Sequence, residues 1–223
     1  ISAANLAALA KARAAGALCV VATGRSWASA ERALPADLPI DYLVVSSGAG
    51  TLDWASKTYV TTSTLAPAEV CAAAAALVER RLDFMIHAPL PDNHRFAFHR
   101  AAGVADFERR LALHRAWAAA WYGDGYKTAS QLLAIHDGQR PLEDEVARAL
   151  PDLTVLRTTS PLDHESVWIE VFPRTVSKSL ACAAIARRHG LGPDSVVAVG
   201  NDTNDLDLLR WAGRDVVRAD AHP

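Results

Sequence analysis

Residues 18–26 read Leu-Cys-Val-Val-Ala-Thr-Gly-Arg-Ser, and the fold class follows from this segment. The apolar run 18–22 is typical of a short buried strand, and Thr23 and Gly24 begin the loop before the next helix. A second apolar run, 42–45, follows that helix and ends in Ser-Ser-Gly. Strand-helix units of this kind form a parallel sheet covered by helices, with ligands bound at the carboxyl ends of the strands. The segment therefore predicts an α/β protein.

A long block interrupts this pattern. From residue 53 to residue 172, short apolar runs flank turn residues such as those at 91–93, which is typical of antiparallel hairpins, and a helix is expected at 105–120. The helical period returns at 176–189, before a buried strand at 195–199. We therefore expect two domains: a core made of residues 1–52 and 173–223, and an inserted α+β domain made of residues 53–172.

The amino-acid composition limits the kinds of partner that we expect the protein to bind. The 223 residues are 51% hydrophobic and 22% charged, which is typical of a folded globular chain. Because 23 Lys and Arg balance 25 Asp and Glu, we expect neither nucleic acid nor a membrane surface as a partner. Cys19, Cys71 and Cys182 form no Cys-x-x-Cys pair, so we expect three buried thiols and a reducing cytoplasm.

Three positions carry candidate chemistry, each where a strand meets a loop. Thr23, with the backbone N–H groups that follow it, forms an anion site at a helix start. Lys178 begins another helix, where its ammonium can reach a phosphate or, alternatively, lie in solvent. Residues 200–205 read Gly-Asn-Asp-Thr-Asn-Asp, a set of oxygen ligands that suits magnesium or, alternatively, caps a helix.

Together the three segments resemble the haloacid dehalogenase superfamily of phosphatases, in particular its Cof-like branch, over almost the whole chain. The resemblance implies a Rossmann-like parallel-sheet core with an inserted cap, or lid, domain. It implies that Thr23 and Lys178 are catalytic. The phosphate-binding residues that it implies are Thr23, Gly24, Arg25, Ser47, Lys178 and Asn204. The Mg²⁺ ligands that it implies are Asn201, Asp202 and Asp205.

The sequence departs from the family pattern in two ways. The Asp-x-Asp-Gly-Thr loop, which carries the family's nucleophile, is not found in residues 1–223. We expect it immediately upstream of Ile1, on a strand between 18–22 and 195–199, and we expect the fragment to be inactive by itself. Asn201 stands where the family usually has Asp, and Ser47 where many relatives have Asn.

The resemblance implies a magnesium-dependent phosphatase of small phosphorylated metabolites, such as sugar phosphates, that acts through an aspartyl-phosphate. A non-catalytic phosphometabolite-binding or regulatory module without the nucleophile is the alternative. A dinucleotide-dependent oxidoreductase is excluded because no Gly-x-Gly-x-x-Gly turn is found. Candidates for substrate choice in the cap are polar or aromatic: His87, Asn93, His94, His99, Tyr126, Lys127 and Trp168.

Overall fold

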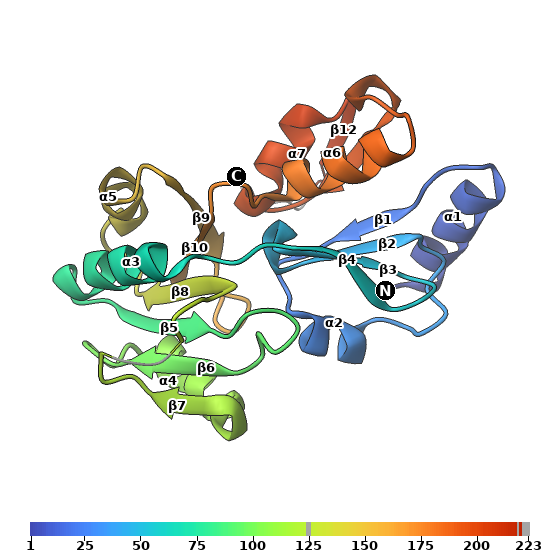
Figure 1. Cartoon of the computed structure of the whole chain (residues 1–223). Helices are drawn as coiled ribbons and strands as arrows, with labels where there is room; N and C mark the ends of the chain where they lie inside the picture. Colours follow the sequence, from blue (N-terminus) through green and yellow to red (C-terminus); the bar gives the residue numbers. More distant parts are fainter. Residues whose placement is uncertain (124–125, 218, 220–223) are drawn as a thin grey trace. The chain divides into compact units, whose positions relative to one another are not determined.

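The computed structural model describes residues 1–123, 126–217 and 219 (Figure 1). Contacts divide the chain into two compact units. The first unit consists of Ile1–Thr62, Val176–Val199 and Asp207–Val216. The second consists of Ser63–Thr175, Gly200–Leu206 and Val217–Pro223.

The first unit is built on a four-stranded sheet. Its strands, in spatial order, are β1 (Val20–Ala22), β2 (Tyr42–Val45), β3 (Gly50–Asp53) and β4 (Thr58–Thr62). β1 pairs with β2 in parallel, with Val20 opposite Tyr42, and the other pairs are antiparallel. The chain connects β1 to β2 through α2 (Trp27–Ala33), as the strand-helix-strand order of the sequence predicts. The sheet extends to Thr62, beyond the boundary expected at residue 52.

Helices and a small second sheet complete the first unit. The remaining elements are α1 (Ala3–Ala14), α6 (Lys178–Arg188), α7 (Leu206–Trp211), β11 (Val197–Gly200) and β12 (Arg214–Val217). Ile185 of α6 packs against Tyr42 and Val44 of β2, which fixes α6 on the sheet. Among the described strands, β1 pairs only with β2, and β11 pairs only with β12. Both β1 and β11 therefore have an unpaired edge.

The second unit contains a six-stranded sheet that is separate from the first sheet. Its spatial order is β7 (Ala118–Ala120), β6 (Phe96–His99), β5 (Asp83–His87), β8 (Gln131–His136), β10 (Val167–Pro173) and β9 (Leu153–Thr159). Only the β6–β7 pair is parallel among the described pairs of this sheet. The antiparallel pattern expected in the middle of the sequence is therefore present.

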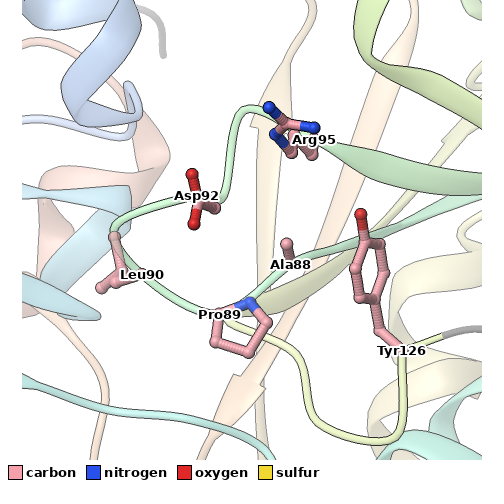
Figure 2. Close-up of a pocket in the computed structure, with 6 residues that line it drawn as sticks. All are labelled: Ala88, Pro89, Leu90, Asp92, Arg95 and Tyr126. Carbon is pink, nitrogen blue, oxygen red and sulfur yellow. The ribbon is translucent and has the colours of Figure 1, made fainter.

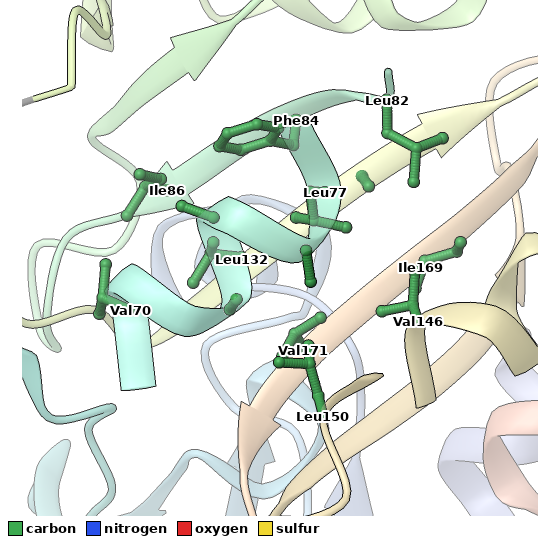
Figure 3. Packing of buried hydrophobic residues seen from close by; sticks show 14 of the residues in the cluster. Val70, Leu77, Leu82, Phe84, Ile86, Leu132, Val146, Leu150, Ile169 and Val171 are labelled. Carbon is green, nitrogen blue, oxygen red and sulfur yellow. The ribbon is translucent and has the colours of Figure 1, made fainter. Parts of the chain in front are cut away.

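Alternating side chains of this sheet build two cores. Phe84 and Ile86 pack with α3 (Pro67–Glu79) and α5 (Leu142–Ala149) in the larger core, part of which is shown in Figure 3. Met85 points to the opposite face and packs with Phe107 and Leu111 of α4 (Ala105–Leu113). The two-residue period of a strand explains how one sheet serves both faces.

The prediction of a single helix over 105–120 is wrong, because the helix in the structure is shorter. α4 ends at Leu113, and Ala118–Ala120 forms β7, with Ala118 opposite Phe96. Alanine favours helices, but intrinsic propensity is a weak preference that tertiary pairing overrides. Here the backbone of the three alanines pairs with the edge of β6 as a parallel strand.

The expectation of three buried thiols also fails in part. Cys19 is buried and Cys182 partly buried, but Cys71 is exposed, and all three are free. Cys71 lies on α3, whose buried face includes Val70, Ala74 and Leu77. The helical period places the Cys71 side chain outside this face, where it is exposed to solvent. Burial raises the pKa of the Cys182 thiol to about 11.

Among the described residues, no helix combines the length and the apolar character needed to cross a bilayer.

Candidate functional site in the first unit and the 200–205 loop

Thr23 continues the parallel pairing of β1 beyond the end of the strand. Its N–H donates to the carbonyl of Val44 at 2.9 Å, and its own carbonyl accepts from the N–H of Ser47 at 3.0 Å. The Thr23 hydroxyl accepts from the N–H of Arg25 at 3.2 Å, which leaves its O–H to donate elsewhere. Thr23 and Gly24 are half-buried, while the exposed Arg25 side chain donates to the Ser29 hydroxyl at 3.2 Å.

The tight turn after β2 lies beside this loop. The N–H of Ser46 donates to the carbonyl of Arg25 at 2.9 Å. Ser46 and Ser47 are buried, with φ angles of 48° and 54°. This left-handed conformation is uncommon for residues other than glycine. Strain of this kind concentrates at functional sites.

Lys178 is the first residue of α6 and is only 4% exposed. Ser177 caps the helix, because its hydroxyl accepts from the N–H of Leu180 at 3.2 Å. A Cβ at Gly48 would lie 2.3 Å from the Ser177 carbonyl oxygen, so the 46–48 turn and the start of α6 are in direct contact. The structure therefore brings Thr23, Ser47 and the segment carrying Lys178 together, and it excludes the alternative of a solvated surface lysine at position 178.

Asp207, which the sequence analysis did not single out, is bonded to the start of α6. Its Oδ2 accepts from the N–H of Ser179 at 3.0 Å. Burial would raise the pKa of Asp207, but hydrogen bonds from Ser177 and Ser179 outweigh burial and lower it. The carboxylate thus holds the first turn of α6, the turn in which Lys178 lies. The only signal in the sequence was a third carboxylate close behind Asp202 and Asp205.

We expect Gly48→Ala to destabilise the protein by about 3 kcal/mol or more, because the added Cβ meets backbone rather than a flexible side chain. Gly16→Ala is the matched control, since Gly16 also has a positive φ, of 87°, but nothing lies within 4 Å of its Cβ position. The control carries only the conformational cost of about 1 kcal/mol. Urea unfolding of both variants measures the difference. Equal losses of stability would contradict the close contact between Gly48 and Ser177.

The 200–205 loop is folded by its own carboxylates. Oδ2 of Asp205 accepts from the N–H groups of Asn201 at 3.0 Å and Asp202 at 3.4 Å. Oδ1 of Asp202 accepts from the N–H of Thr203 at 2.7 Å. Gly200 is required, because a Cβ there would lie 2.7 Å from Cβ of Asp205. The helix-capping interpretation of these acidic residues is therefore correct for this local structure, whatever else they bind.

The oxygen atoms of this loop fit part of a magnesium shell. Asp202 and Asp205 supply two carboxylates, and Asn201 supplies a neutral amide oxygen. Within the described ranges, no group of three or more His, Cys, Asp or Glu side chains could hold a metal ion. Mg²⁺ is usually bound by one or two carboxylates together with water and substrate phosphate, so a shell of this kind needs the remaining ligands from elsewhere.

Comparison with known proteins then assigns a family. Residues 1–223 match the family model of the haloacid dehalogenase-like hydrolases. The chain belongs to this family. The stress response protein YhaX of Bacillus subtilis (strain 168) is 31% identical over 88 residues, which are 40% of this chain and 28% of that relative.

Solved structures share the fold of this haloacid dehalogenase-like hydrolase at low sequence identity. A phosphatase of the haloalkanoate enzyme superfamily from Bacteroides thetaiotaomicron has a TM-score of 0.79 at 18% identity, over 100% of this chain and 78% of that one. A sugar phosphatase of HAD subclass IIB has a TM-score of 0.74 at 18% identity, over 100% and 82% of the two chains. The predicted family and α/β fold class are thus confirmed.

The substrate-choice candidates of this haloacid dehalogenase-like hydrolase fall into two groups. Trp168 and His99 are packing residues: the Trp168 indole donates to Oδ2 of Asp106 at 2.7 Å, and the His99 ring lies against Phe84. His94 lies against the Trp117 ring, and Lys127 is exposed. The second group lies at or near an open hollow (Figure 2): Tyr126 lines it, Asn93 lies on the loop that forms it, and His87 ends β5 just before that loop.

His87 is buried at the end of β5, where its Nδ1–H donates to the carbonyl of Asn93 at 2.8 Å. Burial and then the charge of Arg110 lower the pKa of His87 to about 3. In the unfolded chain the ring titrates near 6.5. Since the unfolded state binds the proton between these two values, this contribution to stability is complete above pH 6.5 and is lost as the pH falls.

We therefore expect the free energy of unfolding to fall by about 2 kcal/mol more between pH 7 and pH 5 in the wild type than in His87→Gln. Urea unfolding at the two pH values measures this. His164→Asn, at an exposed histidine of the same unit, serves as the control and should keep the wild-type dependence. An unchanged dependence in His87→Gln would contradict a neutral buried ring.

Proposed function

We propose that this haloacid dehalogenase-like hydrolase is a magnesium-dependent phosphatase of small phosphorylated metabolites, such as sugar phosphates. The observation that carries the proposal is the burial of Lys178 at the start of α6, next to the turn that hydrogen-bonds to Thr23. A lysine is rarely buried without a function or a charged partner. A hydroxyl, backbone N–H groups and an ammonium in one region suit a phosphoryl group.

Each residue then has a role. The Thr23 hydroxyl and the N–H of Gly24 donate to phosphoryl oxygens, Arg25 and Ser47 shape the loop, and Lys178 neutralises charge as it develops. The loop residue proposed to position the phosphoryl group is Asn204. The residues proposed to hold the metal are Asn201, Asp202 and Asp205, and bound Mg²⁺ supplies further charge neutralisation. Because Asn201 carries no charge, we expect weaker Mg²⁺ binding than with Asp at that position.

The reaction needs a nucleophile. We propose that an aspartate in a segment outside residues 1–223 attacks phosphorus, expels the alcohol and forms an aspartyl-phosphate, which water then hydrolyses. The unpaired edges of β1 and β11 support a further strand in the first unit. Val197 and Val199 of β11 are 60% and 64% exposed, which is unusual for an apolar strand and fits a surface that another segment covers.

A non-catalytic phosphometabolite-binding or regulatory module is the second candidate. The observation that favours it is the lack of an Asp-x-Asp-Gly-Thr loop in residues 1–223. The codons upstream of Ile1 in the reading frame distinguish the two candidates. An Asp-x-Asp encoded there supports the phosphatase, whereas its absence supports the binding module.

Phosphate release by the full-length protein tests the proposal. We expect hydrolysis of an aryl phosphate and of part of a sugar-phosphate panel with Mg²⁺, and loss of activity with EDTA. If no substrate releases phosphate with Mg²⁺, the phosphatase proposal fails. Equilibrium binding of the same sugar phosphates to the inactive protein would then support the binding module.

We also propose that the protein is cytoplasmic and binds neither nucleic acid nor a membrane. Its three free cysteines fit a reducing compartment.

A further inference from the structure

Asp207 lies in the first turn of α7, and its carboxylate is bonded to the first turn of α6. Its Oδ2 accepts from the N–H of Ser179, the second residue of α6, at 3.0 Å. The Ser177 hydroxyl oxygen accepts from the N–H of Leu180, the third residue, and lies 2.9 Å from the Ser179 hydroxyl oxygen. Side chains therefore satisfy two of the N–H groups that a helix start leaves without partners.

The two serine hydroxyls tie the carboxylate more closely to the helix start. Burial would raise the pKa of Asp207, but hydrogen bonds from the hydroxyls of Ser177 and Ser179 and from the N–H of Ser179 lower it. The start of a helix carries partial positive charge, which favours a carboxylate at this end of α6. Asp207 is thus held by the backbone and the side chains of the first turn.

The Asp207 carboxylate lies beside the face of α6 that carries Lys178. Lys178 and Cys182 are four residues apart on this helix, so their side chains share one face. Burial and then the charge of Asp207 raise the pKa of the Cys182 thiol, whereas the charge of Lys178 lowers it. Because charged groups shift a pKa mainly over short distances, both groups lie near the thiol.

Two contacts from distant parts of the sequence fix the first turn of α6. The first is the 46–48 turn, since a Cβ at Gly48 would lie 2.3 Å from the Ser177 carbonyl oxygen. The second is the bond between Ser179 and Asp207. Lysine has a flexible four-carbon side chain, so the place of its ammonium depends on the backbone that carries it. A displacement of about 1 Å at a catalytic group can lower a rate by about 100-fold.

We propose that Asp207 is a positioning residue of the phosphoryl site, which fixes the first turn of α6 and thereby keeps the Lys178 ammonium where it neutralises the phosphoryl group. This inference rests on the proposed phosphatase function. Asp207 acts through Ser179 and the backbone of α6, not on the substrate. Its removal therefore matters for the reaction only as long as position 178 carries the ammonium.

A double-mutant cycle in the full-length enzyme tests this dependence. We expect Asp207→Ala to lower kcat for p-nitrophenyl phosphate by about 10-fold with little change in KM, because the ammonium no longer meets the transition state correctly. In the Lys178→Met background the same substitution should change kcat by less than about twofold, since no ammonium is left to position.

Two further variants complete the cycle. Asp207→Asn should recover most of the loss, because its amide oxygen can still accept from the N–H of Ser179. Asp37→Ala removes an exposed carboxylate of the same unit and should change kcat in neither background. Urea midpoints show which variants are folded at the assay temperature. If Asp207→Ala is not folded, Asp207→Ser takes its place, because the shorter side chain ends before the N–H of Ser179.

The outcomes separate this inference from the proposed function. An equal loss of kcat in both backgrounds, or no loss in the wild-type background, would overturn the positioning role of Asp207 while leaving the phosphatase intact. If the wild type hydrolyses no phosphate ester, the phosphatase proposal fails, and the cycle is read as equilibrium binding of inorganic vanadate. An affinity loss in Asp207→Ala that disappears with Lys178→Met then supports positioning, whereas equal losses or no wild-type binding refute it.

Discussion

Lys178→Met in the full-length protein should lower turnover of an aryl phosphate by about 100-fold or more. The substitution keeps an unbranched side chain at this buried position, so it removes charge with little change in packing. A charge that neutralises the transition state in a site sheltered from water contributes several kcal/mol, and each ~1.4 kcal/mol is a factor of ten in rate. Steady-state kinetics with Mg²⁺ measures the loss.

Two controls make the result interpretable. Lys11→Met changes an exposed helical lysine of the same unit and should leave turnover unchanged. The urea midpoint of Lys178→Met shows whether the variant is folded at the assay temperature. A folded Lys178→Met with turnover within twofold of wild type would remove Lys178 from the catalytic machinery and with it the main support for the phosphatase.

Asp83→Ala should destabilise the second unit by about 3 kcal/mol or more. Asp83 is fully buried, and its Oδ1 accepts from the N–H groups of Ala101, Ala102 and Gly103 at 2.6, 2.8 and 3.1 Å. Its Oδ2 accepts from the N–H of Val104 at 2.7 Å. Alanine leaves four N–H groups in the partly buried turn before α4 without this acceptor, and a group left unsatisfied in the interior costs about 1–3 kcal/mol.

Urea unfolding followed by the tryptophan fluorescence of the protein measures this loss. Asp83→Asn should be less damaging, because its amide oxygen still accepts from part of the turn while its NH₂ opposes the remaining donors. Asp152→Ala is the control in the same unit, since its side chain is 93% exposed, and should change stability by less than about 0.5 kcal/mol. A loss below about 1 kcal/mol for Asp83→Ala would mean that water replaces the carboxylate.

The part of the site that depends on local sequence patterns in the first unit could be predicted from the sequence. The apolar run before Thr23 indicates a buried strand, and the carboxyl end of such a strand is where an α/β protein binds its ligand. Sequence could not show that Lys178 is buried, because one lysine at a helix start has the same pattern in solvent or in a site. The distant 46–48 turn meets Ser177, the residue before Lys178, only in the folded chain.

Other features depend on pairings that local patterns do not encode. Ala118–Ala120 forms β7 because the edge of β6 is available, although alanine favours a helix. Asp207 was missed because its role lies in the N–H of Ser179, on a different helix. Asp92 was taken as a turn residue and Arg95 was not singled out, yet both line the open hollow of the second unit.

A crystal structure of the full-length protein with Mg²⁺ and vanadate tests most directly whether the three sequence segments form one phosphoryl site. We expect the Thr23 hydroxyl and the Lys178 ammonium within hydrogen-bond distance of the vanadate oxygens. We also expect Mg²⁺ on oxygen atoms of the 201–205 loop, and an upstream aspartate in line with vanadium. Vanadate bound away from Thr23, with the Lys178 ammonium paired elsewhere in the protein, would contradict the account.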